Sequence, residues 1–551
     1  MNAHRVFRIF PVTVALLTLL IFLPAVRNDY VNWDDQANFL NNPDYRGLGW
    51  PQLGWMWTTT LGGRYIPLTW MTLGLDYTIW EMDPFGYHLT SVLFHTVNAA
   101  LFYFVALAIL QAAMRGSSDA MRQRIPIGAF FAALVFALHP LRAESVAWLT
   151  ERRDVVSGMF YLLAMLAYLR RFPDEPERPM RRRYYWASFT FFVMAVLSKE
   201  ITVTLPLVLL ILDVCPLHRL SGSPVRWFRT SEARKVWLEK LPFLAIGMAD
   251  GALALYIGAQ QHLTATLTAV NGFSRFAICI YGLAFYFRKM LAPLHLAALY
   301  ALNTHRVDPN ALPFQLSTVV VILVGAAAIL FRRKAPGFLA ACLAYTVTLV
   351  PVLGIFHNGL QITADRYSYL ACLGWAILAG GGLLALWKDA RMRRAAAIAA
   401  VLIICFLSAL TWRQVGFWRD SETLWTHSLE VEPSAVAHDN LGLVYSARGD
   451  LAGGLEQYRA ALEIDSDHDN AHNNLGTSLL LLGDSEEALH EFQKALKINP
   501  RMASAQTGWG EALVKQGKVD EAIEHFRLAL QLDPAYKPAQ KDLQQALEKP
   551  K

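Results

Sequence analysis

The chain has 551 residues, of which 54% are hydrophobic and only 17% are charged. Soluble domains usually contain about 25% charged residues, so this composition excludes an ordinary soluble protein and indicates several membrane-spanning helices. The charge divides unevenly: residues 1–419 hold 38 Lys and Arg against 22 Asp and Glu, whereas residues 420–551 hold 12 against 22. We therefore expect a basic membrane part followed by an acidic soluble part.

The first apolar run, residues 7–26, follows a positively charged start and is long enough to cross a bilayer. Because no small-x-small cleavage site follows it, we interpret it as a retained membrane span rather than a secretory signal. The five cysteines lie within or at the ends of apolar runs, and none forms a CxxC pair. We interpret them as small packing residues rather than as metal ligands or disulfides.

Ten further apolar runs are interpreted as crossing helices: residues 88–110, 126–141, 155–169, 185–198, 201–215, 241–258, 314–331, 336–355, 368–387 and 395–412. Residues 276–300 carry Arg288 and Lys289 in their middle, so we interpret them as re-entrant or interfacial. With the N-terminus in the cytoplasm, the loops richest in Lys and Arg face the cytoplasm, as the positive-inside rule requires. An odd number of crossings then puts the C-terminal part outside the cytoplasm.

Residues 414–551 are predicted to form a separate domain after the membrane part, residues 1–413. Three segments that begin at Ala437, Ala471 and Ala505 resemble one another at a constant offset of 34 residues. This period, with small residues in fixed phase, is typical of tetratricopeptide repeats, which pair two antiparallel helices. Such arrays present a concave groove to an extended peptide, and a spacer or a dimerisation module is the alternative.

The loop after the first span contains two adjacent carboxylates, Asp34 and Asp35. Asp34 follows the last apolar residue of the span by a short stretch that reaches at most about 26–29 Å, so the pair stays near the bilayer surface. A carboxylate there can act as general base toward a hydroxyl that attacks a lipid-linked sugar. The alternatives are a solvated loop, the N-cap of a short helix, or a divalent metal site.

Charged side chains recur in the other loops that are predicted on the same side. Basic side chains suit an anionic lipid headgroup, because phosphate oxygens accept charge-assisted hydrogen bonds. We predict lipid-phosphate contacts for Arg64, Arg152, Arg153, Lys199 and Arg366. Supporting roles are predicted for Asp83, His88, Glu144, Asp154, Glu200, Asp365 and Tyr367. The simpler interpretation is that these residues are interface anchors, helix caps or polar residues inside the bundle.

Several stretches resemble a known family: NWDDQANFLNNP, RYIPLTWMTLGLDYTIWEMDPFGYHLTSVLFH, ALHPLRAESVAWLTERRDVVSG, LSKEITVTLPLVLL, ADRYSYL and WRDSETLW, followed by the repeats. In them the chain resembles the transmembrane and tetratricopeptide repeat-containing proteins, membrane glycosyltransferases of the GT-C class, and their bacterial relatives. The resemblance implies an all-α fold, with a GT-C-type transmembrane helix bundle followed by a repeat solenoid, in the inner membrane of a bacterium.

The resemblance also implies a reaction. In that family the acidic pair of the first loop is assigned to catalysis, and here it matches Asp34 and Asp35. The implied donor is a polyprenyl-phosphate sugar, mannose, and the implied acceptor is a Ser or Thr hydroxyl of an exported protein. We expect an inverting transfer in which one of the two carboxylates is the general base and the cations stabilise the departing lipid phosphate.

Two other functions stay open as alternatives. A non-catalytic, membrane-anchored repeat scaffold for envelope assembly would need its repeat groove but neither Asp34 nor Asp35. A lipid-sugar flippase would need an internal repeat within the bundle, and the sequence shows none. Nucleic-acid binding is not expected, because the basic residues belong to predicted cytoplasmic loops and the soluble part is acidic.

Overall fold

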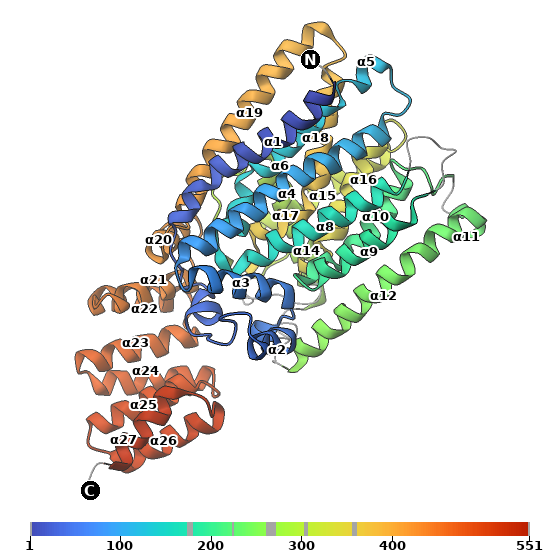
Figure 1. Cartoon of the computed structure of the whole chain (residues 1–551). Helices are drawn as coiled ribbons and strands as arrows, with labels where there is room; N and C mark the ends of the chain where they lie inside the picture. The colour runs from blue at the N-terminus through green and yellow to red at the C-terminus, as the bar shows by residue number, and fades with distance from the viewer. Residues whose placement is uncertain are drawn as a thin grey trace. The chain divides into compact units, whose positions relative to one another are not determined.

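A computed structural model describes residues 3–172, 180–222, 225–260, 271–301, 307–354 and 361–548. The chain divides into two compact units, Met1–Asp420 and Ser421–Lys551. The sequence predicted this boundary at 413/414, whereas the last long helix of the first unit continues to Gly416. Almost all regular structure is helical (Figure 1), which confirms the predicted all-α fold.

The first unit is built from long helices joined by short helical turns. The long helices are α1 (Ala3–Phe22), α4 (Pro84–Ala113), α6 (Ile125–Ala137), α8 (Arg152–Arg170), α9 (Arg182–Val196), α10 (Leu205–Val214), α12 (Ser231–Gln260), α14 (Gly272–Leu291), α15 (Leu312–Leu330), α16 (Pro336–Leu349), α18 (Leu373–Leu386) and α19 (Ala390–Gly416). The elements that connect these helices are η1 (Leu23–Arg27), η2 (Gln36–Leu40), α2 (Trp50–Thr58), η3 (Leu61–Gly63), α3 (Pro67–Trp80), α5 (Asp119–Arg122), η4 (Pro140–Arg142), α7 (Ala143–Ala147), η5 (Leu149–Glu151), η6 (Glu200–Thr204), α11 (Arg226–Arg229), η8 (Val350–Val352), η9 (Asp365–Tyr367) and α17 (Ser368–Ala371).

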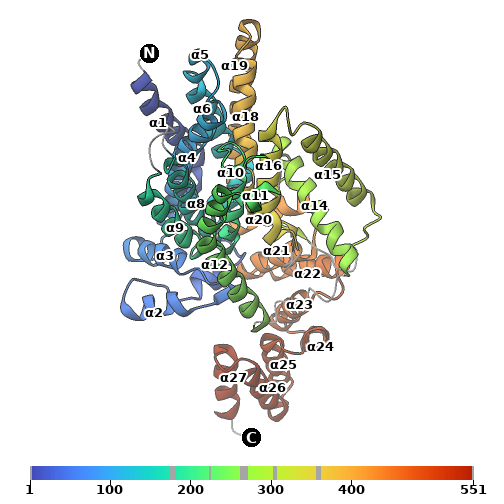
Figure 2. The same cartoon turned by 90° about the vertical axis from the view of Figure 1, so that its right-hand side faces the viewer.

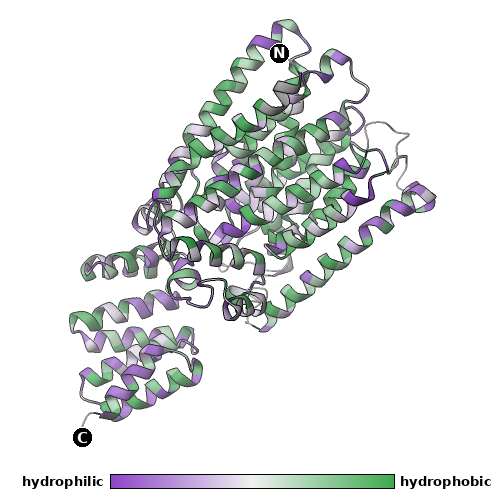
Figure 3. Cartoon of the chain, in the orientation of Figure 1, coloured by the Kyte–Doolittle hydropathy of each residue, from purple (hydrophilic) through white to green (hydrophobic). Residues whose placement is uncertain are grey.

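The described residues include six helices that are long and apolar enough to cross a membrane: Ile9–Arg27, Pro84–Ala113, Asp119–Ala137, Ser231–Gln260, Leu312–Leu330 and Ala390–Gly416. A pair of helices bent by 58°, Asp365–Ala371 and Leu373–Leu386, meets the same test together. The other predicted crossings are helical as well, but they are shorter or more charged than a full span. Apolar residues dominate the helices of this unit (Figure 3), and the protein is a membrane protein.

Helix α4 occupies the centre of the bundle and packs against α1, α6 and α8. Its buried side faces these helices, whereas Phe85, Leu93 and Val97 are 40%, 46% and 46% exposed on its other side. Two of its interior polar side chains bind neighbouring helices: His95 Nδ1 lies 2.8 Å from the Tyr369 hydroxyl, and Asn98 Nδ2 donates to the Val155 carbonyl at 2.8 Å. These bonds join α4 to α17 and α8, so the core of the bundle is fixed by polar contacts as well as by apolar packing.

Helix α14 and the chain after it fold back on themselves. Near the start of α14, the Cys279 thiol donates to the Leu353 carbonyl at 3.1 Å. After α14, the strand β1 (Tyr300–Ala301) pairs antiparallel with β2 (Gln361–Thr363), with Tyr300 opposite Thr363. Helix α14 and the strand β1 after it therefore both contact the chain between residues 353 and 363. Residues Gly272–Leu291 form one continuous helix, and the re-entrant or interfacial course of residues 276–300 stays a prediction.

A small apolar core orders the long loop that follows α1. The core joins Phe39, Tyr45, Met56, Trp70 and Tyr87, which come from η2, the loop after it, α2, α3 and α4. Figure 2 shows α2 and α3 at the end of the bundle opposite the N-terminus and α5. The loop is thus a packed cap on the bundle, and the residues that it carries have fixed positions.

The second unit is a stack of helix pairs. Its helices are α20 (Ser421–Val431), α21 (Ala435–Ala447), α22 (Leu451–Ile464), α23 (Asp469–Leu482), α24 (Ser485–Ile498), α25 (Ala503–Lys515), α26 (Val519–Leu532) and α27 (Lys537–Glu548). The glycines that recur every 34 residues allow close packing within each pair, because a Cβ at Gly476 would lie 2.9 Å from the Phe492 ring and one at Gly510 would lie 2.5 Å from Phe526.

The three repeats also share a polar contact between their two helices. The nitrogen and oxygen atoms lie within 2.8 Å in the pairs His438–Gln457, His472–Glu491 and Gln506–His525. The same two positions are used each time, so these pairs fix the register between the helices of a repeat. In the second repeat the pair is buried and charge-assisted, since Glu491 also binds Lys494 at 2.8 Å.

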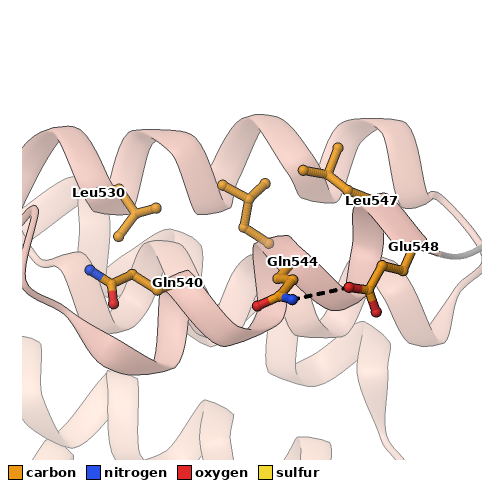
Figure 4. A pocket seen from close by; sticks show the side chains of 6 residues that line it. Leu530, Gln540, Gln544, Leu547 and Glu548 are labelled. Atoms are coloured by element: carbon orange, nitrogen blue, oxygen red, sulfur yellow. Dashed lines mark hydrogen bonds between the residues drawn. The ribbon is translucent and has the colours of Figure 1, made fainter.

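A surface groove of about 440 Å³ lies between α26 and α27 at the last helix pair (Figure 4). It is lined by Leu530, Gln540, Leu543, Gln544, Leu547 and Glu548. On the α27 side of the groove, Gln544 Nε2 donates to Glu548 Oε1 at 3.0 Å. The groove is apolar with an amide rim, and it lies in a different unit from the charged residues that the sequence singled out.

The close packing at Gly476 can be tested by substitution with valine. Val has a higher helix propensity than Gly, so any loss of stability comes from the clash with Phe492. We expect Gly476→Val to lower the free energy of unfolding of residues 421–551 by about 1–3 kcal/mol, measured by thermal denaturation followed by circular dichroism. Thr477→Val, at the exposed neighbouring position, is the control and should unfold as the wild type does.

Candidate active site

The buried connection between α6 and α8 forms the floor of the candidate site. Pro140 lacks a backbone N–H and cannot continue α6, and the chain proceeds through η4, α7 and η5. All residues from 139 to 151 are buried, which is unusual for a connection between helices. It carries two acidic residues, Glu144 and Glu151, into the interior, where each needs a positively charged partner.

The Glu151 carboxylate is surrounded by three cations. Both of its oxygens bind the guanidinium of Arg153, with 2.9 Å from Nε to Oε2. Lys199 Nζ donates to Oε2 at 2.9 Å, and Arg366 Nε lies 3.1 Å from Oε1. Three separate segments of the chain thus meet on one carboxylate that is itself 0% exposed.

Two further carboxylates complete this group of charges, which we call the Glu151 cluster. Lys199 Nζ also donates to Asp154 Oδ1 at 2.6 Å, and the Arg366 backbone N–H donates to Glu144 Oε2 at 2.7 Å. The Arg366 guanidinium binds the same Glu144 carboxylate. Lys199 and Arg366 therefore each bridge two acids, and the cluster comprises Glu144, Glu151, Arg153, Asp154, Lys199 and Arg366.

The charge state of Glu151 follows from this geometry. Burial alone would raise the pKa of its carboxyl group, but the neighbouring Arg153, Lys199 and Arg366 outweigh burial and hold that pKa well below its usual range. Glu151 is therefore ionised. Removing one partner from such a buried group typically costs about 3–5 kcal/mol, so the cluster is a rigid part of the fold.

Asp35 is a buried structural residue, in contrast to its neighbour. One carboxylate oxygen accepts hydrogen bonds from the backbone N–H and hydroxyl of Thr150, at 3.2 Å and 2.6 Å. The other accepts from the Val31 backbone N–H at 3.0 Å. Burial raises the pKa of Asp35 to about 7, although the bonds from Thr150 and Val31 act in the opposite direction. Asp35 thus ties the first loop to η5, and its side chain does not cap η2.

Asp34 is exposed and has an unusual backbone conformation. Its φ of 64° lies in the left-handed region, which non-glycine residues seldom adopt. The charge of Asp34 acts on the half-buried Arg64. Burial and Arg153 lower the pKa of Arg64, whereas Glu151, Asp34 and Glu200 raise it. The predicted twin acids therefore differ, because one carboxylate is available at the surface and the other is enclosed.

Some of the predicted phosphate-binding and supporting residues have structural roles instead. Arg152 is fully buried, where it lies 2.7 Å from Asp76 and donates to the Ser91 hydroxyl at 2.7 Å. We therefore revise its predicted role in phosphate binding, because α3 and α4 already occupy its donors. Asp83 caps α4, since its side chain accepts from Phe85 N at 3.0 Å. Its expected supporting role at the site becomes a helix-capping role.

The remaining supporting residues lie around the Glu151 cluster or within the bundle. Asp365 is buried and accepts from the Tyr300 hydroxyl at 3.2 Å. The Tyr367 ring lies 5.0 Å from the Arg366 guanidinium. His88 is buried in α4. One oxygen of the half-buried Glu200 accepts no hydrogen bond from the residues that the structure describes.

A divalent metal site is one alternative for the adjacent acids of the first loop. In the described ranges, no three His, Cys, Asp or Glu side chains come together in a way that could hold a metal ion. Both oxygens of the buried Asp35 accept hydrogen bonds, from Thr150 and Val31, whereas Asp34 is exposed. The charges of the site are balanced by Arg and Lys side chains instead.

Glu151, the residue at the centre of the site, is not among the residues predicted from the sequence. It lies in the stretch LTERRD, directly before two arginines. The sequence does contain a signal for Glu151: an acid stands beside two arginines in a loop on the side that is predicted to be poor in Lys and Arg. Its partners Lys199 and Arg366 lie 48 and 215 residues further along the chain, so their convergence on Glu151 depends on the fold.

The repeat region and most of the chain resemble known proteins. Tetratricopeptide repeat family models match residues 433–501 and 473–537. Among solved structures, the second TPR domain of the human RPAP3 protein in complex with an HSP70 peptide is 23% identical. That match covers 21% of this chain and 96% of the RPAP3 domain, with a TM-score of 0.20.

Similarity also extends over the membrane unit. The chain is 25% identical over 476 residues to "Protein O-mannosyl-transferase F38B6.6" of Caenorhabditis elegans, covering 82% of this chain and 62% of the relative. It is 24% identical over 494 residues to "Protein O-mannosyl-transferase TMTC4" of Homo sapiens, covering 81% and 65%. The chain thus spans less than two thirds of the length of these relatives. These similarities confirm the family resemblance: the chain is a homologue of the TMTC protein O-mannosyl-transferases, with tetratricopeptide repeats in its C-terminal unit.

Proposed function

We propose that this chain is a membrane glycosyltransferase that transfers mannose from a polyprenyl-phosphate donor to a Ser or Thr hydroxyl of an exported polypeptide. The names of its relatives support the reaction class. The observation that carries the proposal is that the exposed Asp34 carboxylate and the Arg153 guanidinium both act on the charge of Arg64. A base and a set of cations in one place are what transfer from a lipid phosphate to a hydroxyl needs.

Asp34 acts as the general base in the proposed reaction. Its carboxylate takes the proton of the acceptor hydroxyl while the hydroxyl oxygen bonds to the anomeric carbon of the sugar. The bond from that carbon to the phosphate oxygen breaks, and the lipid phosphate leaves with the electron pair. Attack opposite the leaving group inverts the anomeric configuration, through a transition state that resembles an oxocarbenium ion.

Arg64 and Arg153 stabilise the charge that grows on the departing phosphate. Burial and the charge of Arg153 both disfavour a cation at Arg64, so an incoming phosphate would relieve an unfavourable position. Arg153 is held by Glu151, which fixes the direction of its guanidinium. Lys199 and Arg366 lie behind it with their donors bound to carboxylates, and they contribute mainly through their fixed charge.

Asp35 serves as a positioning residue in this scheme. Its three hydrogen bonds connect the first loop to Thr150, one residue before Glu151. The loop that carries the base and the turn that carries the centre of the cluster are therefore held together. Asp35 itself is enclosed and has no oxygen directed at an acceptor.

The repeat domain binds the acceptor polypeptide in the same compartment as Asp34. The Asp29 backbone N–H donates to the Arg419 carbonyl at 2.8 Å, so the end of the membrane unit lies beside the first loop. The repeat unit begins directly afterwards, at Ser421. With the N-terminus in the cytoplasm of a bacterium, both would lie on the outer face of the inner membrane, where exported polypeptides emerge.

The base can be tested by replacing Asp34 with asparagine, which keeps the shape and removes the proton acceptor. We expect Asp34→Asn to reduce the transfer rate by about 10²- to 10⁴-fold. The measurement uses purified protein with radiolabelled polyprenyl-phosphate mannose and a Ser/Thr-containing peptide. Asp44→Asn removes an exposed acid of the same loop and should retain full activity. Equal transfer by Asp34→Asn and wild type would favour the scaffold function over the enzyme.

The structural role of Asp35 predicts a different effect. Asp35→Ala leaves buried N–H groups of Val31 and Thr150 without an acceptor, and each such group typically costs about 1–3 kcal/mol. We expect a lower unfolding temperature together with slower transfer, whereas Asp34→Asn should slow transfer with no loss of stability. Thermal unfolding in detergent separates the two, and an unchanged unfolding temperature for Asp35→Ala would contradict this role.

The orientation can be tested by labelling single added cysteines with a membrane-impermeant maleimide on intact spheroplasts. Ala447→Cys lies at an exposed position of the repeat domain, and Ala335→Cys lies in the exposed turn between α15 and α16. We expect Ala447→Cys to react in intact spheroplasts and Ala335→Cys only after permeabilisation, with the wild type as background. The opposite pattern would reverse the proposed orientation.

A further inference from the structure

Three tryptophans stack in a row beside the candidate site. Trp33 and Trp148 have ring centroids 6.2 Å apart at an interplanar angle of 26°, and Trp148 and Trp418 are 5.6 Å apart at 21°. Trp148 and Trp418 are only 1% and 2% exposed. The three residues come from the first loop, the turn before η5, and the segment that follows α19, so the stack joins segments far apart in the sequence.

This stack contacts both halves of the proposed catalytic machinery. Trp33 directly precedes Asp34, and its backbone carbonyl accepts a hydrogen bond from Trp148 Nε1 at 2.9 Å. The guanidinium of Arg366 lies 5.3 Å from the Trp148 ring, at a distance that allows a cation–π interaction. Trp148 therefore contacts both the residue before Asp34 and a cation of the Glu151 cluster.

The end of the membrane unit supports the first loop from the other side. The Asp29 N–H donates to the Arg419 carbonyl at 2.8 Å, and Asn28 Nδ2 donates to the Val415 carbonyl at 3.4 Å. Trp418 lies between these two contacts and closes the stack against Trp148. The left-handed backbone of Asp34 needs such support, because a non-glycine residue leaves that conformation readily when its surroundings loosen.

We propose that Trp418 is a positioning residue for Asp34: through Trp148 it holds Trp33, and thereby the base, at a fixed place relative to Arg366. The expected change in kcat rests on the proposed function. The expected change in the order of the first loop rests on the stack alone. Trp418 lies shortly before Ser421, so the segment that leads into the repeat domain forms part of the frame of the site.

The test compares Trp418→Leu with Trp418→Phe in the full-length protein in detergent. Leucine removes the aromatic stack and phenylalanine keeps a ring. Hydrogen exchange of residues 28–40 measures the order of the loop, near-ultraviolet circular dichroism measures the coupling of the stacked rings, and mannosyl transfer to a peptide gives kcat and KM. Trp412→Leu is the matched control, because Trp412 lies at the exposed surface of α19.

We expect Trp418→Leu to speed exchange of residues 28–40 by about threefold to tenfold, as the loss of one aromatic contact allows. It should lose the circular dichroism signal of the stack and lower kcat with an unchanged KM for the peptide. Trp418→Phe and Trp412→Leu should match the wild type in hydrogen exchange and in kcat, although Trp418→Phe also lacks the circular dichroism signal of the Trp418 indole. If Trp418→Leu does not fold, Trp33→Leu removes the other end of the stack and should give the same exchange and kinetic changes.

Equal exchange of residues 28–40 in Trp418→Leu and Trp418→Phe would overturn the proposal. So would a Trp418→Leu variant whose only change is a higher KM, because that result would mean a role in acceptor binding. Hydrogen exchange needs no substrate, so a wild-type protein without mannosyl transfer would refute the proposed function while the exchange comparison still decides the role of Trp418.

Discussion

The Glu151 carboxylate and its three cations are the constraint on which the arrangement of the site depends. An ionised carboxylate that is fully enclosed in protein is unfavourable unless charged partners replace the lost water. Here Arg153, Lys199 and Arg366 supply that replacement, and they arrive from three different places in the chain. The folding of α8, of the turn before η6 and of η9 is therefore linked, since none of these cations can be withdrawn without leaving a buried charge unpaired.

The same constraint explains why the two acids of the first loop have separate roles. Thr150 lies next to Glu151, and its N–H and hydroxyl bind Asp35. Asp35 is buried where it satisfies these donors, whereas Asp34, with its left-handed backbone, lies at the surface. Asp35 holds the loop in place, while Asp34 remains accessible to solvent. A pair of equivalent carboxylates could not serve both purposes.

The sequence predicted well those features that depend on local patterns. The 34-residue period identified the repeats, because each helix pair repeats the same Gly and Ala contacts, and the apolar runs identified the helices of the bundle. It also indicated the charged loops from which the site is built. It could not tell which acid is enclosed, that Arg152 pairs with Asp76, or that Glu151 is central. Those facts depend on partners far along the chain, and residue type alone does not reveal a partner.

The saturation of the buried cations also limits how a lipid phosphate can be bound. Lys199 and Arg366 each hold two carboxylates, so a phosphate could take their hydrogen bonds only by leaving Glu144 or Glu151 with fewer partners in the interior. Arg64 differs because it is half-buried and because burial and Arg153 lower its pKa. A phosphate that binds Arg64 does not take a hydrogen-bond donor away from Glu144 or Glu151. In the proposed reaction, Arg64 is therefore the first contact of the donor phosphate, and the Glu151 cluster provides a fixed positive field behind it.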